Sequence, residues 1–296
     1  GLPAAESVID DESVTSETLQ RLWEAILDTQ NATQAMDTTR PVVEIPIQTD
    51  KPWGAVFFSD QHVLGTGVNH QRMEADMQTW RDHRDILGVF DLGDNLDQFL
   101  PTKHPSAMME TLARPGIQRA MVKHLWQKYL SEVLKAKVRG NHDAWSSAAD
   151  YDFAGELAQE MGVPFLGDGG RVWLHVGKQT YKLELRHDFP FKSSLNTTNS
   201  QRRLFEFALG ADVVCFGHLH YPDLHYAWRN GQNVALLRCS TYKETDSYAQ
   251  SKGLQLGYAP PPPDMPMVVF WPHTHRLLPF RDYRDGLMCL KALRGL

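Results

Sequence analysis

The stretch Arg139-Gly140-Asn141-His142-Asp143 decides the fold, because three side chains that bind metals or move protons follow a strand end there. The preceding residues Ala136-Lys137-Val138 indicate the end of a buried strand. Gly140 lets the chain turn sharply because it has no Cβ. Asn141 then offers a carbonyl oxygen, His142 a titratable imidazole and Asp143 a carboxylate. A polar turn has the same composition, so a functional interpretation requires partners elsewhere in the chain.

Four other strand-like segments end in the same way. They alternate with helical patterns, and hairpins follow, which predicts an α/β fold with mixed sheets. In α/β sheets, ligands gather at the carboxyl ends of the strands, so the residues after these segments are expected to meet in one crevice. The segments and the residues after them are Trp53 to Phe58 with Asp60 and His62, Ile86 to Phe90 with Asp94 and Asp97, Thr180 to Leu185 with His187, and Val213 to Phe216 with His218 and His220.

The donor atoms of these clusters are oxygens and imidazole nitrogens, without a thiolate. Such a set suits Mn²⁺, Fe, Zn²⁺ or Mg²⁺ better than a structural zinc site. The i, i+2 spacing within Asp60-x-His62 and His218-x-His220 places each pair on one face of an extended segment. Seven candidate ligands exceed what one transition ion needs, so we expect two metal ions that share a bridging carboxylate.

In order and residue type, the five clusters resemble the motif set of the calcineurin-like metallophosphoesterases. The resemblance covers roughly residues 53–280. It implies a sandwich of two mixed β-sheets flanked by helices, in four layers α/β/β/α, with a dinuclear metal site at the strand ends. The matching blocks are Asp60-x-His62, Gly93-Asp94-x-x-Asp97, Gly140-Asn141-His142-Asp143, His187 and Gly217-His218-x-His220.

The fourth block departs from the family pattern. A glycine often precedes its histidine, whereas this chain has Arg186 before His187. His175 is a rival for the same position, but it lies in the middle of a strand-like run, where a lone histidine is usually structural. We therefore prefer His187.

The resemblance also implies which residues bind the two metal ions. Mn²⁺ is the expected metal, with Fe, Zn²⁺, Ni²⁺ or Mg²⁺ as alternatives. The first ion would be held by Asp60, His62 and His220, the second by Asn141, His187 and His218, and Asp94 would bridge them.

The implied activity is hydrolysis of a phosphodiester, or of a phosphomonoester, by in-line attack of metal-bound hydroxide. His142 would stand beside the metals without binding them and would protonate the departing alkoxide as general acid. Asp97 would orient His142. The sequence assigns no chemistry to Asp143. The substrate is a phosphate ester, either a small molecule or a nucleic acid.

Two other functions are open. One is an Mre11- or SbcD-like nuclease acting on DNA, favoured by a basic stretch between residues 112 and 140 in which Glu132 is the only acid. The lack of an evident second DNA-binding domain speaks against it. The other is a metal-stabilised scaffold that binds proteins without turnover, which the complete ligand set disfavours.

The net charge of −6 resides in the first 40 residues, which hold eight acids and two arginines. The other 256 residues hold 28 acids and 28 bases, so broad electrostatic capture of nucleic acid is not expected. Apolar residues at helical spacing predict a helix over 16–36, whose apolar stripe we expect to cover the main domain. The predicted division is an acidic tail with an amphipathic helix at 1–40 and a catalytic domain at 41–296.

The composition, with 42% hydrophobic and 22% charged residues, suits a soluble globular protein. The three cysteines are an odd number and indicate reduced thiols in a cytoplasmic protein. No apolar run approaches the length of a membrane span, so no membrane partner is expected. Between Thr38 and Lys51 we expect an extended connector, and we expect Met267 to Trp271 to be the last strand of the core.

Overall fold

Two structural units make up the chain, Gly1–Pro41 and Val42–Leu296. The computed structural model describes residues 15–37, 42–98, 111–147, 152–193, 195–207, 210–229, 231–245 and 264–296. In the first unit, helix α1 (Ser16–Asp37) forms where the apolar spacing predicts a helix. Leu19, Leu22 and Trp23 lie about half exposed on α1, and the surface that would cover this stripe stays a prediction.

Strand β2 (Trp53–Phe58) is the centre of a five-stranded sheet, and all six of its residues are buried. It lies between the parallel strand β3 (Leu87–Asp91) and the antiparallel strand β10 (Met267–Phe270). Beyond these lie β4 (Leu134–Lys137), parallel to β3, and β11 (Leu277–Phe280), antiparallel to β10. The nearly continuous apolar run of β2 is typical of a strand that is covered on both faces.

The second sheet has six strands in the order β1-β5-β6-β7-β9-β8. Its parallel pairs are β1/β5, β6/β7 and β7/β9, and its antiparallel pairs are the hairpins β5/β6 and β8/β9. The strands are β1 (Val43–Ile47), β5 (Gly169–Val176), β6 (Gln179–Arg186), β7 (Val213–Phe216), β8 (Asp223–Arg229) and β9 (Gln232–Arg238).

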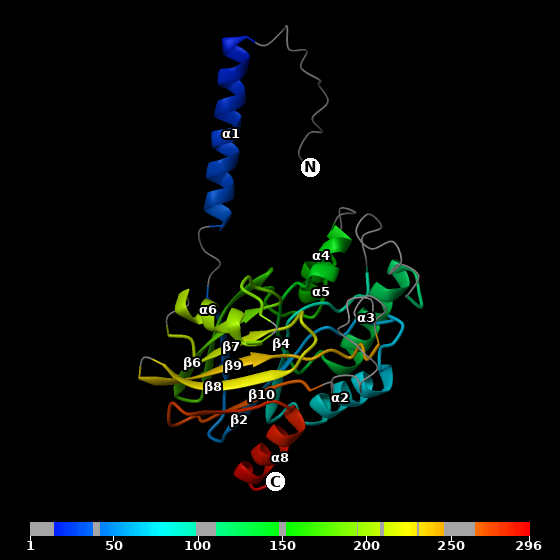
Figure 1. Ribbon diagram of the computed structural model, residues 1–296, viewed down its shortest axis with the longest axis vertical. Helices are drawn as coiled ribbons and strands as arrows, with labels where there is room; N and C mark the ends of the chain where they lie inside the picture. Colours follow the sequence, from blue (N-terminus) through cyan, green and yellow to red (C-terminus); the bar gives the residue numbers. More distant parts are fainter. Residues whose placement is uncertain are drawn as a thin grey trace. The chain divides into compact units, whose positions relative to one another are not determined.

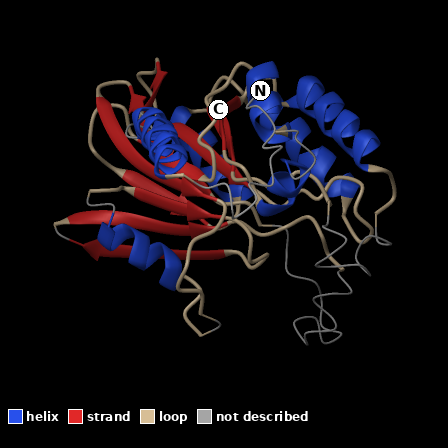
Figure 2. Cartoon of the chain, turned by 90° about the horizontal axis from the view of Figure 1, so that it is seen from above, coloured by secondary structure: helices blue, strands red, loops and turns tan. Residues whose placement is uncertain are grey.

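Helices cover the outer faces of both sheets (Figures 1 and 2). On the five-stranded sheet, α8 (Tyr283–Arg294) packs against β2, β10 and β11, and α2 (His70–Asp82) packs against β3 and α3 (Pro115–Tyr129). On the six-stranded sheet, α6 (Asn199–Phe207) packs against β7 and β9. One hydrophobic core contains residues of both sheets. The prediction of an α/β fold with two mixed sheets flanked by helices is confirmed.

Two edge strands differ from the sequence prediction. The extended connector contains β1, whose Pro46 pairs with His175 at the edge of the six-stranded sheet. The last strand is β11 rather than β10, and it contains Pro279 at the edge of the other sheet. Proline lacks an N–H for the ladder and is tolerated on edge strands, so a proline-containing segment reads as a connector from sequence alone.

All five motif blocks lie at the carboxyl ends of strands. Strands β2, β3 and β4 run parallel in one sheet, and β6 and β7 run parallel in the other. Asp60 and His62 follow β2, Asp94 and Asp97 follow β3, Asn141 follows β4, His187 follows β6, and His218 and His220 follow β7. The α/β topology thus delivers the side chains to one edge of the sandwich, as parallel strands do.

Among the described residues, no helix has the length and apolar character needed to cross a membrane.

The core under this edge sets our first prediction. Phe57 of β2 is fully buried and stacks on Phe90 of β3, with 5.4 Å between ring centroids. Phe57→Ala should lower the free energy of unfolding by about 3–5 kcal/mol, because it removes buried area and leaves a cavity. Urea denaturation measures the change. Met288→Ala is the control, because Met288 is 66% exposed on α8; it should change stability by no more than about 0.5 kcal/mol. Equal effects of the two substitutions would contradict the assigned core.

Candidate metal centre

The backbone at the predicted ligands is held in an unusual conformation. Seven non-glycine residues of the described chain have positive φ, and five of them are Asp60, His62, Asp94, His218 and His220. Positive φ is uncommon outside glycine, and it persists only where the surroundings enforce it. The prediction that Asp60-x-His62 and His218-x-His220 are extended segments is therefore wrong, because all four residues are in the left-handed region. Such strain gathers at functional sites, and the positions found here coincide with those that the motifs single out.

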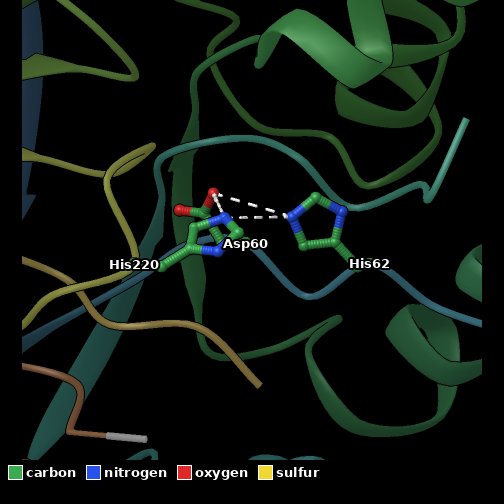
Figure 3. Close-up of side chains that lie close together, drawn as sticks. All are labelled: Asp60, His62 and His220. Carbon is green, nitrogen blue, oxygen red and sulfur yellow. Dashed lines mark hydrogen bonds and ion pairs between the residues drawn. The ribbon is translucent and has the colours of Figure 1, made fainter. Parts of the chain in front are cut away.

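The first cluster consists of Asp60, His62 and His220, whose ligand-capable atoms all lie within 4.8 Å of one another. Asp60 Oδ1 is 3.0 Å from His220 Nε2 and 3.8 Å from His62 Nε2. The two Nε2 atoms are 3.4 Å apart. Figure 3 shows both rings and the carboxylate directed toward a common point. Three side chains from two sheets thus present one oxygen and two nitrogens to the same small volume.

The second cluster consists of Asp94, His187 and His218, whose ligand-capable atoms also lie within 4.8 Å of one another. His187 Nε2 is 3.0 Å from Asp94 Oδ2 and 3.0 Å from Asn141 Oδ1. His187 Nδ1 lies 2.7 Å from the carbonyl oxygen of Leu92, to which it donates, so Nε2 is the nitrogen directed into the cluster. All four predicted members of the second site are therefore found together.

The two clusters are neighbours. The backbone N–H of His218 donates to Asp60 Oδ2 at 2.9 Å, which ties a member of the second cluster to a member of the first. Burial and the charge of Asp60 would raise the pKa of Asp94, but His187 and His142 outweigh both and hold it below its ordinary value. Asp94 accepts the backbone N–H of His142 at 2.8 Å through its other oxygen, Oδ1. The seven predicted ligands therefore form one continuous site.

The chemistry of these residues fits divalent cations. Asp60 Oδ1 and Asp94 Oδ2 are buried and accept no hydrogen bond from the described residues, although each lies 3.0 Å from a histidine nitrogen. A buried polar atom without a hydrogen bond needs an explanation. Two carboxylates and neighbouring imidazoles, all pointing inward, match the oxygen and nitrogen donor set of a transition-metal site.

The electrostatics of the clusters agree with this. Burial alone would lower the pKa of His187, but Asp94 and Asp60 outweigh it and raise the pKa to about 10. Burial would likewise lower the pKa of His62, whereas Asp60 and Asp97 raise it to about 9. Burial would raise the pKa of Asp60, and His220 and His62 hold it well below its usual range. The cluster therefore favours positive charge, which protonated histidines or metal ions can provide.

His142 stands beside both clusters. Its Nδ1 donates to the carbonyl oxygen of Gln98 at 2.7 Å, so Nε2 faces the site, 4.0 Å from Asp94 Oδ2. Its ring meets the ring of His62 edge-on, with centroids 4.7 Å apart, and lies 4.5 Å from that of Trp145. Burial lowers the pKa of His142 to about 3. His142 is thus aimed at the site by a backbone carbonyl.

Asp97 contacts a different histidine from the one predicted. Its Oδ1 lies 3.1 Å from His62 Nδ1 and 3.0 Å from the Lys243 ammonium. Asp97 also forms a group with His62 and His142 within 4.8 Å. A lysine already paired with this carboxylate disfavours a third cation there, because like charges repel. The orienting role of Asp97 toward His142 stays a prediction.

Asp143 had no role in the sequence and proves to join two motif loops. Its carboxylate accepts the backbone N–H groups of Asp94 at 2.9 Å, Asn95 at 3.1 Å and Gly140 at 3.1 Å. Gly140 permits this approach, because a Cβ there would lie 2.0 Å from Asp94 Oδ1. Asp143 therefore fixes the loop of Asp94 against the loop of Asn141 and His142.

Lys137 completes this network beneath the site. It is fully buried, and its ammonium lies 2.7 Å from Asp91 Oδ2, 3.9 Å from Asp143 Oδ2 and in hydrogen-bond contact with Asn95. A buried ammonium is stable only when paired and hydrogen-bonded. The sequence shows Lys137 only as a basic residue at a strand end, because two of its partners, Asp91 and Asn95, lie more than 40 residues away along the chain.

Several basic residues of the stretch around α3 are paired with acids of other segments. Lys123 pairs with Glu156 and Glu160, Lys128 with Glu74, and Arg139 with Asp168. This arrangement is that of a solvated helix face.

His175, the rival of His187, and two further histidines contact residues that belong to neither cluster. His175 contacts Thr180 and Glu44, His273 contacts the carbonyl of Asp50, and His275 contacts Asp212.

Several solved structures are similar to this chain, whereas no family model and no curated protein matches it. A predicted phosphoesterase from Streptococcus pneumoniae has 13% identity and a TM-score of 0.38 over 77% of this chain and 98% of its own. The calcineurin-like phosphoesterase YfkN from Bacillus subtilis has 9% identity and a TM-score of 0.42 over 83% and 100%. The nuclease MPE from Pseudomonas putida has 15% identity and a TM-score of 0.33 over 76% and 87%.

The chain resembles the calcineurin-like metallophosphoesterases in fold and motifs. With all three TM-scores below 0.5, this resemblance rests on the two mixed sheets and on the meeting of the five motif blocks.

The hydrogen bonds by which Asp143 joins the loops of Asp94 and Gly140 should contribute to stability. Asp143→Ala should lower the free energy of unfolding by about 3–5 kcal/mol, because it breaks a buried charged network and strands backbone N–H groups. Asp168→Ala is a matched control, since Asp168 is 66% exposed and pairs with Arg139 of the same loop; it should cost about 0–1 kcal/mol. Urea unfolding distinguishes them. If Asp143→Ala lowers the free energy of unfolding by no more than the control does, Asp143 does not hold the two loops together.

Proposed function

We propose that this chain is a dinuclear metal-dependent phosphoesterase that hydrolyses a phosphodiester, with Mn²⁺ as the first metal to test. The observation that supports it best is the meeting of two oxygen-and-nitrogen clusters beside one histidine that belongs to neither. Phosphoester hydrolysis needs charge stabilisation on both sides of phosphorus and a proton for the leaving group. In this proposal the two clusters provide the charge stabilisation, and His142 provides the proton.

The first cluster of Asp60, His62 and His220 would hold one metal ion. Asn141, His187 and His218 would hold the other, with Asp94 between them. Divalent cations bound there would lower the pKa of an attacking water and offset the charge that develops on the phosphoryl oxygens. The inward-directed Nε2 atom of His187 and the buried oxygens of Asp60 and Asp94, which accept no hydrogen bond, support this assignment.

His142 would supply the proton to the departing alkoxide. Its Nε2 faces the site because Nδ1 is held by the Gln98 carbonyl. Burial disfavours the protonated ring, whereas an anionic phosphoester beside it favours that form. We therefore expect His142 to take up its proton together with the substrate. The leaving group would lie next to His142 and close to the Trp145 ring.

A DNA substrate has less support than a small phosphodiester. The feature that favoured a nuclease was the basic stretch at 112–140, and Lys123, Lys128 and Arg139 in it are paired with acids. The scaffold alternative is disfavoured, because all seven ligand positions are occupied by metal-competent side chains that lie together. A cytoplasmic location is part of this proposal.

Hydrolysis of bis(p-nitrophenyl) phosphate and p-nitrophenyl phosphate across Mn²⁺, Ni²⁺, Zn²⁺ and Mg²⁺ tests the proposal. We expect metal-dependent release of p-nitrophenol, faster from the diester, and abolition by a chelator. Absence of turnover of both esters with all four metals would refute the enzyme. In parallel, labelled single- and double-stranded DNA should remain intact at catalytic protein concentrations.

His142→Ala tests the general acid. The variant should lose about 10²–10⁴-fold in kcat, the usual contribution of general acid catalysis, while it still binds two metal ions per chain. His175→Ala is the matched control, because His175 lies on β5 away from the clusters and should leave kcat unchanged. Loss of bound metal from His142→Ala would show that His142 is a ligand rather than the acid.

A further inference from the structure

A buried lysine outside the motif blocks reaches the edge of the first cluster. Lys243 is 1% exposed, and its ammonium lies 3.0 Å from Asp97 Oδ1. The same oxygen lies 3.1 Å from His62 Nδ1, the ring nitrogen directed away from Asp60 and His220. Lys243, Asp97 and His62 thus form a chain of contacts that ends at a predicted metal ligand.

The segment that carries Lys243 is attached to the loops of the first cluster. Thr241 Oγ1 donates to the carbonyl oxygen of Asp60 at 2.9 Å, and the N–H of Tyr242 donates to the same oxygen at 3.3 Å. Thr241 Oγ1 also accepts the N–H of Lys243 at 3.0 Å. On the other side, the N–H of Asn69 donates to the Tyr242 carbonyl at 2.8 Å. Lys243 is therefore held in register with Asp60 and His62.

Space for this contact is provided by Gly65. A Cβ at Gly65 would fall 2.5 Å from Asp97 Oδ2, so any larger residue would displace the carboxylate from its place beside His62 and Lys243. Asp97 is fully buried, and a buried carboxylate is costly unless a counter-charge and hydrogen bonds stabilise it. Among the described residues, His62, His142 and Lys243 lie near Asp97. The two histidines are positively charged only when protonated, whereas Lys243 carries an ammonium.

We infer that Lys243 is a positioning residue for the metal centre: it holds the Asp97 carboxylate against His62 Nδ1, so that His62 Nε2 points at the first metal position. This inference rests on the proposed dinuclear site. A metal-binding imidazole generally donates its other N–H to a carboxylate or carbonyl, which fixes the ring and its tautomer. At His62 the Asp97 carboxylate lies 3.1 Å from Nδ1, in the place that the hydrogen-bonded carbonyl of Leu92 takes at His187.

The role is distinct from that of a ligand. Lys243 is an ammonium donor without a lone pair, so it acts through Asp97. Without it, Asp97 would lose its fixed counter-charge, and the His62 ring would no longer be confined to one orientation. The first metal position should weaken, whereas the second, where His187 is fixed by a backbone carbonyl, should not.

The test is Mn²⁺ titration of the full chain by isothermal calorimetry. Wild type should bind two ions. Lys243→Met, which keeps the length of the side chain and removes its charge, should weaken one of the two sites by about 10–100-fold, the usual effect of removing a partner of a ligand. Asp97→Asn should weaken the same site and serves if Lys243→Met fails to fold. Lys128→Met is the control, because Lys128 is half exposed and contacts Glu74 and the ring of Tyr129, neither of which belongs to the clusters.

A second measurement reads the orientation of His62 directly. In ¹⁵N NMR spectra of the Zn²⁺-loaded protein, His62 should carry its proton on Nδ1 in wild type, and the signal should broaden or shift in Lys243→Met. Unchanged affinity at both sites in folded Lys243→Met and Asp97→Asn would overturn the inference. Wild type that binds two ions but hydrolyses no phosphoester would remove the proposed enzyme and leave this comparison intact.

Discussion

The concentration of buried negative charge at one sheet edge is the constraint on which the rest of this structure depends. Asp60, Asp94 and Asp97 are at most 1% exposed, and a buried carboxylate is costly unless cations and hydrogen bonds surround it. Histidines inside the clusters, and Lys243 and Lys137 at their borders, lie beside these and neighbouring carboxylates and can compensate their charge. Asp60 and Asp94 also have positive φ, a strained conformation that persists only where the surroundings enforce it.

Two sets of residues hold these charged groups in place, an inner shell and an outer shell. The inner shell is made of residues at strand ends, each brought to the edge by parallel strands of the two sheets. The outer shell joins the loops to one another: Asp143 binds the loop of Asp94 to that of Asn141, and Thr241 binds the Lys243 segment to Asp60. Precise placement of a metal ligand depends on such partners as much as on the ligand itself.

The inner shell could be predicted from the sequence, because strand ends are marked by apolar runs that stop at glycine, aspartate, asparagine or histidine. Strands β1 and β11 escaped prediction because their prolines, Pro46 and Pro279, read as connectors. The outer shell could not be predicted at all. Lys243 meets Asp97 across 146 residues and Lys137 meets Asp91 across 46, and no local pattern distinguishes a lysine that becomes buried from one that stays in water.

Anomalous diffraction from crystals grown with Mn²⁺ would show whether these strand ends form one dinuclear metal centre. We expect two anomalous peaks about 3.5–4 Å apart, with Asp94 in contact with both. Asp60, His62 and His220 should contact one peak, and Asn141, His187 and His218 the other. A map without a peak at these residues, or with a single peak that His142 contacts, would contradict it.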